Sequence, residues 1–404
     1  MREPPQRARL KRSTCRWASK TAPRVVVAPD KFKGSLSARE VAAALAAGWS
    51  DVFAGEWETV CVPMADGGEG TVEAFLDGGA RKVSAAVHGP LGETLEAQYA
   101  LDGTTAIIES ALASGLVLIP PERRDAMHAS SFGTGELLRA ALDAGAKRVV
   151  IGIGGSASSD GGAGLLQALG FALLDVNGKP LGPGGAALAG LASLSSESAD
   201  PRLTSLTIDV ASDVDNPLTG PAGASAVFGP QKGARPSDVA ALDAALDHFA
   251  DVVARATGRD LRDSPGAGAA GGMGFALIAL LGASIRPGVE LIAELRGLSN
   301  ALEGAALCLT GEGRIDEQTL HGKTVDGVAR LARARDVPVL AFGGSVDSAV
   351  EPELFRRGVA CLPIADAPLS LAESMAQSGM LLRAASARAA RCWRAASRVT
   401  GPGP

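Results

Sequence analysis

The sequence RVVVAPDKFKGSLSARE, residues 24–40, carries the signals of one strand, one turn and one helix. Its three consecutive valines predict a short buried strand, and the polar segment around Gly34 predicts a turn. Ser37 and Glu40 form the S-x-x-E pattern of a capping box, which predicts a helix start at AREVAAALAAGW. A strand that passes through a turn into a helix is the repeating unit of a parallel α/β sheet.

The same order recurs on both sides of a less regular middle section. WETVCVPM (57–64) leads into the turn ADGGEG and a further helix, and the strand-like runs AALCLT, VPVLAF and GVACLPI follow in the last third. Between residues 81 and 118, short β-like runs broken by Gly-Pro and Asp-Gly predict hairpins. We therefore expect a two-domain α/β protein: a parallel-sheet domain built from both ends of the chain, an inserted second α/β domain, and ligands between them.

The expected domain limits follow from these breaks in the pattern. The discontinuous domain comprises residues 24–85 and 298–395, and the inserted domain comprises residues 86–297. Residues 1–23 hold seven Lys or Arg against one acid, so we expect a disordered basic extension, with a transit peptide as the less favoured alternative. Residues 396–404 are expected to form a flexible tail.

The composition excludes several classes of protein. With 46% hydrophobic and 21% charged residues the chain is typical of soluble globular proteins, and a net charge of -5 offers no general attraction to nucleic acid. No apolar run reaches the length of about 18 residues that a membrane span needs, so the cytoplasm is the expected location. The five cysteines form no CxxC pair, which argues against zinc and disulfide frameworks, and Cys61 and Cys308 are expected in the core. The oligomeric state is left open.

Glycine-rich polar turns follow five of the expected strands. Each alone is more often structural than functional, because turns use glycine for positive φ and Asp or Asn for capping. Together, at the carboxyl ends of parallel strands, they predict a shared phosphate and metal site. The five turns are DKFKGS (30–35), ADGGEG (65–70), GGSASSDGG (154–162), SDVDNP (212–217) and GEGRID (311–316).

GGSASSDGG is the richest of these turns. Its glycines let successive N–H groups converge on an anion, and a following helix would add its positive end. Gly154, Gly155, Ser156 and Ser158 are therefore candidate nucleotide-binding residues. Asp160 is placed either to cap the following helix or to bind Mg²⁺, and the two interpretations have equal weight.

Two familiar nucleotide motifs are excluded. HGKT (321–324) ends like a P-loop, but the pattern requires glycine where this chain has Glu317. GIGGSA (152–157) fits the dinucleotide fingerprint, but the residues from Asp160 to Gly162 interrupt the helix that this fold needs.

Carboxylates outnumber cations in the five turns, and so many acids would repel an anion unless a divalent metal were present. Phosphoryl transfer uses this mixture of cations, metal and a proton-accepting carboxylate. The acids are Asp66, Glu69, Asp160, Asp213, Asp215, Glu312 and Asp316, and the cations are Lys31, Lys33, Arg314 and Lys323.

APDKFKGSLSA, PMADGGEGT, GIGGSASSDGGAG, DVDNPL and GEGRIDEQT together resemble the bacterial glycerate kinase type 1 family, over residues 24 to about 390. The resemblance implies a kinase that transfers phosphate from ATP, with Mg²⁺, to D-glycerate, usually at the 2-hydroxyl to give 2-phosphoglycerate. It also implies that the discontinuous domain is Rossmann-like. Ser158-Ser159 stands where the family often has Thr-Asn, and Ser212 stands where a cysteine is common.

The roles within this site are hypotheses. Lys31 or Arg314 would hold the glycerate carboxylate, with Ser35 and Asp316 as further substrate-binding residues, and Lys33 would neutralise the transferred group. Asp66 is the candidate base, with Asp213 or Asp316 as alternatives, and Asp160 and Asp213 are the candidate Mg²⁺ ligands. Rival functions are a kinase that forms 3-phosphoglycerate, a kinase for a related hydroxy acid, and a catalytically silent metabolite-binding protein.

Overall fold

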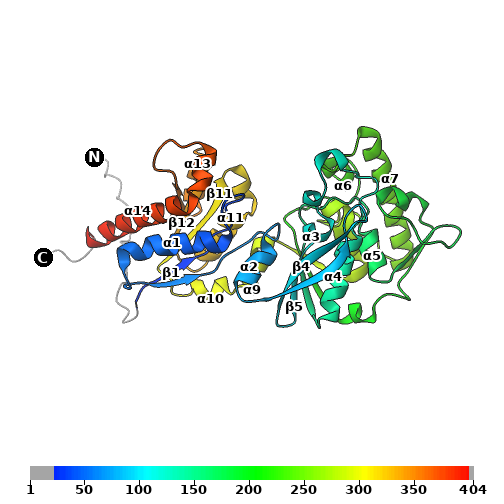
Figure 1. The fold of residues 1–404 in the computed structure, drawn as a ribbon, viewed down its shortest axis with the longest axis horizontal. Helices are drawn as coiled ribbons and strands as arrows, with labels where there is room; N and C mark the ends of the chain where they lie inside the picture. Colours follow the sequence, from blue (N-terminus) through cyan, green and yellow to red (C-terminus); the bar gives the residue numbers. More distant parts are fainter. Residues whose placement is uncertain (1–21, 400–404) are drawn as a thin grey trace, which may run out of the picture.

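A computed structural model describes residues 22–399, in which two principal sheets lie beside each other along the long axis (Figure 1). Residues 1–21 and 400–404 lie outside the described residues, and with them lie most of the predicted basic extension and part of the predicted C-terminal tail. No helix between residues 22 and 399 combines the length and the apolar character that crossing a membrane requires.

The five-stranded sheet is parallel throughout and is built from both ends of the chain, as the sequence predicts. Its strand order is β13-β12-β11-β1-β2. Val25 and Val27 face a cluster formed with α1 and α14, whereas Val26 faces the opposite cluster, because successive strand residues point to opposite faces. The strands are β1 Arg24–Val27, β2 Glu58–Cys61, β11 Leu307–Ile315, β12 Val339–Val346 and β13 Val359–Pro363.

The six-stranded sheet has the order β10-β9-β6-β5-β4-β3. Strands β3, β4 and β5 pair antiparallel, which confirms the predicted hairpins, while β5, β6, β9 and β10 are parallel. The strands are β3 Arg81–His88, β4 Thr94–Asp102, β5 Thr105–Glu109, β6 Arg148–Gly152, β9 Thr207–Ala211 and β10 Ser284–Arg286; a separate hairpin joins β7 Ala172–Leu174 to β8 Ser193–Ser195.

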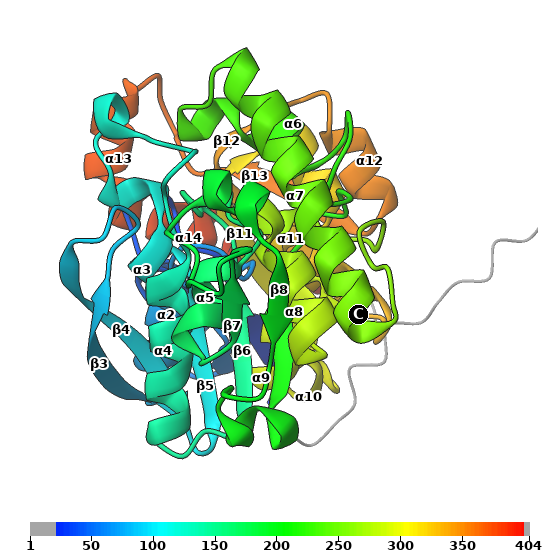
Figure 2. The ribbon, with the colours of Figure 1, turned by 90° about the vertical axis from the view of Figure 1, so that its right-hand side faces the viewer.

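Helices cover both sheets. The capping box predicted for α1 is present, since the Ser37 hydroxyl accepts from the Glu40 N–H and the Glu40 carboxylate accepts from the Ser37 N–H. On the six-stranded sheet, α4, α5 and α8 cover one face and α2 and α9 the other (Figure 2). The helices are α1 Ala38–Phe53, α2 Thr71–Asp77, α3 Ala111–Ser114, α4 Phe132–Asp143, α5 Ala163–Ala168, α6 Ala224–Phe228, α7 Pro236–Thr257, α8 Met273–Leu281, α9 Gly288–Leu295, α10 Leu298–Leu302, α11 Thr324–Arg333, α12 Glu351–Arg356, α13 Leu371–Ala376 and α14 Ser378–Val399.

The two sheets meet where the turn 65–70 after β2 packs against the ends of β6 and β9. A Cβ atom on Gly152 would lie 1.9 Å from the carbonyl oxygen of Gly67, and one on Gly288 would lie 1.8 Å from that of Asp66. Ile107 and Val150 of the six-stranded sheet also share a hydrophobic cluster with Val26 of the other sheet. Backbone contact and a common core therefore place this turn between the sheets.

Several sequence-based details need correction. The boundary expected between residues 85 and 86 falls inside β3, which pairs with β4 from Arg81 onward; the domain limits are otherwise a prediction. Residues 396–399 belong to α14 and not to a flexible tail. Cys308 is buried as expected, but Cys61 is exposed because β2 is an edge strand. GEGRID is not a turn, because β11 continues through Ile315, paired with β12.

Candidate active site

A cavity of about 620 Å³ lies at the carboxyl end of β1, between the turn after β2 and the distal half of β11. It brings together six residues to which the sequence analysis assigns a role, from three separate turns. These are Lys31, Lys33, Ser35, Asp66, Arg314 and Asp316. The cavity thus gathers residues from three of the five turns, whereas the turns 154–162 and 212–217 do not line it.

The segment DKFKGS places its two lysines at the cavity because Phe32 turns inward. Phe32 is 4% exposed and packs in the cluster under α1 and α14. The Lys31 ammonium donates to the backbone carbonyl of Glu69, and that of Lys33 lies 3.4 Å from the Glu69 carboxylate. Ser35 donates to the Phe32 carbonyl at 3.2 Å, so in this structure its hydroxyl supports the turn.

Strand β11 sets the opposite wall. Residues two apart share a face of a strand, so Glu312 and Arg314 project from the same side, and both line the cavity. The Arg314 side chain is 75% exposed and lies 3.1 Å from Asp316, whose carboxylate also caps the turn by accepting from the Gln318 N–H. Arg314 is therefore a cation with room to bind a ligand.

Two carboxyl groups of this cavity have raised pKa values. Burial, followed by repulsion from Asp66, raises the pKa of Asp30 to about 6, although its side chain accepts from the Thr324 hydroxyl at 2.5 Å. Burial raises the pKa of Glu312 to about 7, against the hydrogen bond from the Thr319 hydroxyl. Both acids lie in the polar segments identified from the sequence, but neither was assigned a role there. Asp30 could have been identified from its position directly after the β1 segment.

A smaller cavity of about 120 Å³ lies at the carboxyl end of β6. Three of the candidate nucleotide-binding residues, Gly154, Gly155 and Ser156, line it together with Lys232, which the sequence does not single out. A Cβ atom on Gly154 would lie 3.8 Å from the Cα of Gly68, which lines the larger cavity. The two cavities are thus neighbours across the turn that carries Asp66.

Ser158 and Asp160 do not line this small cavity. Both are fully buried. The Asp160 carboxylate accepts from the Ser131 N–H and hydroxyl and from the N–H groups of Gly162 and Gly164. Asp160 therefore caps α5, in agreement with the first of its two interpretations. The N–H groups at the start of α5, which were expected to face phosphate, donate to this carboxylate instead. The metal role of Asp160 has no support in this geometry.

Asp213 stands apart from Asp160 and close to Asp66. Its carboxylate accepts from the Gly288 N–H at 3.2 Å. Although Asp213 is exposed to solvent, desolvation by the protein around its carboxylate, with repulsion from Asp66 as a further cause, raises the pKa of Asp213 to about 6. Within residues 22–399 no cluster of three or more His, Cys, Asp or Glu is arranged to hold a metal ion.

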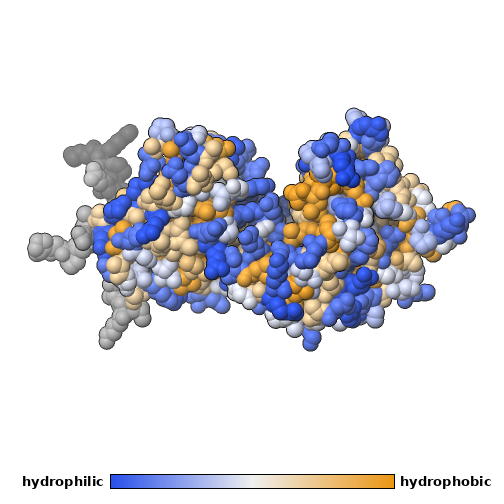
Figure 3. All heavy atoms as spheres, viewed as in Figure 1, coloured by the Kyte–Doolittle hydropathy of each residue, from blue (hydrophilic) through white to orange (hydrophobic). Residues whose placement is uncertain are grey.

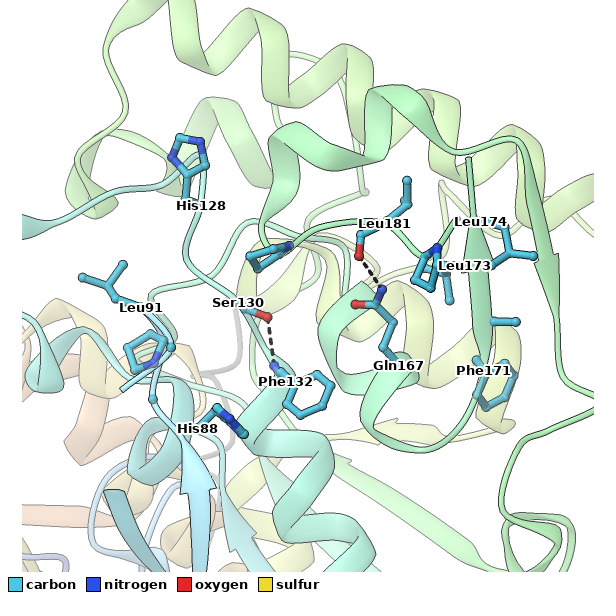
Figure 4. A pocket seen from close by; sticks show the side chains of 16 residues that line it. His88, Leu91, His128, Ser130, Phe132, Gln167, Phe171, Leu173, Leu174 and Leu181 are labelled. Atoms are coloured by element: carbon cyan, nitrogen blue, oxygen red, sulfur yellow. Dashed lines mark hydrogen bonds between the residues drawn. The ribbon is translucent and has the colours of Figure 1, made fainter. Parts of the chain in front are cut away.

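A third cavity, of about 660 Å³, is mostly apolar and contains none of the predicted residues (Figure 4). Its polar groups bond within the protein: Gln167 donates to the Leu181 carbonyl, and the Ser130 hydroxyl accepts from the Phe132 N–H. The space-filling view shows hydrophobic residues gathered on the half of the molecule that contains the six-stranded sheet. The side of the other half that faces it is mainly hydrophilic (Figure 3). The polar chemistry is thus concentrated in the first two cavities.

Comparison with known proteins identifies the family. Residues 25–394 match the family model described as the glycerate kinase family. The chain is 50% identical over 326 residues to the glycerate kinase of Bacillus subtilis (strain 168), covering 80% of this chain and 85% of that protein. It is 49% identical over 327 residues to the glycerate 2-kinase of Escherichia coli (strain K12), again covering 80% and 85%.

The fold agrees with this match. A crystal structure described as that of a candidate glycerate kinase 2 from Salmonella typhimurium LT2 superposes with a TM-score of 0.86 at 43% identity, covering 94% of this chain and 100% of that one. The α/β fold expected from the sequence is thereby confirmed. Sequence and structure lead to one conclusion: the chain belongs to the glycerate kinase family.

Proposed function

We propose that this protein transfers the γ-phosphoryl group of ATP to the 2-hydroxyl of D-glycerate, giving 2-phosphoglycerate. ATP as donor follows from membership of a kinase family, and the name of the Escherichia coli relative supports the 2-hydroxyl. The observation that carries the proposal is the position of the Asp66 turn, which separates a cavity rich in cations and carboxylates from a glycine-lined one.

Glycerate fits the larger cavity, where Arg314 is the better candidate for its carboxylate. A guanidinium can bind a carboxylate through two parallel N–H groups. Lys31 is only 24% exposed and already donates to the Glu69 carbonyl, whereas Arg314 is 75% exposed. Lys31 and Lys33 then add positive charge where the phosphoryl group passes.

Asp66 is the proposed general base for the glycerate hydroxyl. It lines the larger cavity at the border with the Gly154 turn, so a hydroxyl beside it would face the phosphate side. Asp30 lines the same cavity, and the pKa of about 6 that burial and Asp66 impose on it makes it the main rival. Asp316 is a weaker alternative, because its carboxylate accepts from Gln318 and pairs with Arg314.

Mg²⁺ fits the donor set at Asp213. Mg²⁺ is commonly held by one or two carboxylates together with substrate phosphates and water. The raised pKa of Asp213, caused mainly by desolvation and also by Asp66, is consistent with an acid whose ionised form a nearby cation would stabilise. Bound there, Mg²⁺ would neutralise charge on the phosphates, while the backbone of Gly154 to Ser156 would orient them.

The test is release of ADP from MgATP on addition of D-glycerate, followed by phosphorus NMR of the product. The expected product is 2-phosphoglycerate. A 3-phosphoglycerate product would contradict the assigned hydroxyl, and turnover only with another hydroxy acid would change the substrate. D-Glycerate binding without ADP release would favour a silent metabolite-binding protein. The cytoplasmic location and the absence of nucleic-acid partners stay predictions from composition.

A further inference from the structure

Lys232 is a buried lysine without a carboxylate partner. It is 3% exposed and ends the short 3₁₀ helix Pro230–Lys232. Its ammonium donates to the Ser158 carbonyl at 2.5 Å and to the Ser156 hydroxyl at 3.1 Å. Among residues 22–399 no carboxylate lies within ion-pair distance of it, and Asp160 attracts it only from further away. Burial lowers the pKa of Lys232 to about 8.

Such an arrangement is unfavourable for a protein that binds nothing there. A buried charge destabilises the fold unless it is paired and hydrogen-bonded. A lysine ammonium has three N–H donors, and the two hydrogen bonds to the described residues leave one of them for a ligand. The uncompensated positive charge selects an anion.

The cavity beside Lys232 has the size and lining of an anion site. Its 120 Å³ corresponds to about four water molecules at ~30 Å³ each, which suits a small charged group better than a nucleoside. Gly154 and Gly155 line it opposite Ala270, whose φ of 54° is a left-handed conformation that residues with a side chain rarely adopt. Backbone strain of this kind often accompanies ligand sites.

A neighbouring glycine keeps the backbone close to the ammonium. Gly271 has a φ of +69°, and a Cβ atom there would lie 2.1 Å from the Ser158 carbonyl oxygen and 2.9 Å from the Lys232 nitrogen. Any side chain at this position would displace the lysine or the carbonyl that it binds. Two segments far apart in the chain thus hold Lys232 at the cavity.

We propose that Lys232, together with the backbone of Gly154 to Ser156, binds a phosphate group of the ATP triphosphate, an assignment that rests on the proposed function. The anion would lie in the small cavity, next to the turn that carries Asp66. The acceptor hydroxyl would lie on the other side of this turn, in the larger cavity. Lys232 is then a nucleotide-binding residue, distinct from the cations around glycerate.

The test uses inorganic tripolyphosphate as the probe, titrated calorimetrically into the full-length protein without glycerate. Lys232→Met is expected to weaken tripolyphosphate binding about tenfold to a hundredfold, the usual effect of losing a charge-assisted hydrogen bond. The control Lys147→Met, at an exposed lysine before the opposite end of β6, is expected to bind as the wild type does. The KM for ATP is expected to rise in Lys232→Met while D-glycerate affinity stays unchanged.

Unchanged tripolyphosphate affinity in Lys232→Met would overturn the assignment, and so would a selective loss of D-glycerate binding. Should that variant fail to fold, hydrogen exchange of the wild type decides: tripolyphosphate must slow exchange in residues 154–158 and 230–233. Absence of slowing there overturns the role of Lys232. Tripolyphosphate binding through Lys232 without glycerate-dependent ADP release would instead contradict only the proposed function.

Discussion

At the scale of single residues, the site is decided by which polar side chains turn toward the cavities. Phe32 packs inward and leaves the lysines beside it at the cavity, whereas Asp160 turns into the protein and bonds backbone N–H groups. Both residues stand in motifs with mixed polar content. Phe32 turns toward the hydrophobic cluster beneath it. Asp160 turns toward N–H groups at the start of α5, which have no partner within the helix and donate to its carboxylate.

The base assignment predicts a loss of turnover in Asp66→Asn. Removing a general base lowers kcat by about 10² to 10⁴, with little change in the KM for D-glycerate, because the isosteric amide cannot accept the proton. Steady-state ADP release measures this, with Asp102→Asn, at an exposed acid that ends β4, as the control. Wild-type turnover in Asp66→Asn would exclude it as the base, and a larger loss in Asp30→Asn would move the role to Asp30.

Arg314→Ala is expected to raise the KM for D-glycerate by about tenfold or more, since a hydrogen bond between charged groups contributes about 1.5–3 kcal/mol. The KM for ATP should change little. Arg333→Ala, at an exposed arginine of α11, is the matched control. An unchanged KM for D-glycerate in Arg314→Ala would leave Lys31 as the carboxylate partner.

At the scale of elements, β11 is unusual among the parallel strands. Its first half is mainly apolar and buried, whereas its second half contains the ionisable residues Glu312 and Arg314. Its pairing with β12 extends from Cys308 to Ile315, which keeps Glu312 in the sheet and 7% exposed. Parallel strands covered on both faces normally read as hydrophobic runs. The exception at Glu312 coincides with the wall of the larger cavity.

This buried acid predicts a pH-dependent effect on stability. Below pH about 4.5 Glu312 is protonated in both states; as pH rises toward 7 the unfolded chain loses the proton but the folded protein keeps it, so the free energy of unfolding falls. Glu312→Gln removes this loss and is expected to stabilise the protein at pH 8 by up to about 3 kcal/mol. Urea unfolding at pH 4 and pH 8 measures the difference.

The control for that measurement is Glu317→Gln, an exposed acid five residues further along the chain, which should change stability little at either pH. A Glu312→Gln protein that is less stable than the wild type at pH 8 would show that the ionised carboxylate is stabilised by its surroundings. The burial argument would then be wrong.

At the scale of the whole molecule, contact between the sheets depends on glycines that permit close backbone approach. The Gly67 carbonyl lies where a side chain on Gly152 would have to be, and Gly67 itself has a φ of +84°. This contact holds the Asp66 turn between the two cavities. With Asp66 as the proposed base, turnover would depend on how the sheets pack.

Gly152→Ala is expected to lower both stability and kcat. A Cβ atom only 1.9 Å from a backbone oxygen forces the Asp66 turn to move, and overpacking of this kind costs about 1–3 kcal/mol. Thermal unfolding and ADP release measure the two effects. Gly190→Ala is the control, since a Cβ atom there meets nothing within 4 Å. Wild-type kcat in Gly152→Ala would show that the turn position does not depend on this contact.

The sequence predicted elements better than it predicted the site. The capping box at Ser37 and the βα units were confirmed because their signals are local, while GEGRID was wrongly read as a turn, since only pairing with β12 keeps those residues extended. The polar content of the larger cavity was also predictable, from turns at strand ends. Which acids would be buried was not, because burial depends on residues far along the chain.

By itself, the sequence determined the α/β class, the polar turns that supply the site and the family that these motifs resemble. Only the tertiary structure decided that Lys232 meets Ser156, which lies 76 residues away in the chain, and that Asp30 meets Thr324, 294 residues away. It also decided that Asp160 points inward. The physical reason is that local propensity sets the backbone of short segments, whereas the direction and burial of a polar side chain are set by long-range packing.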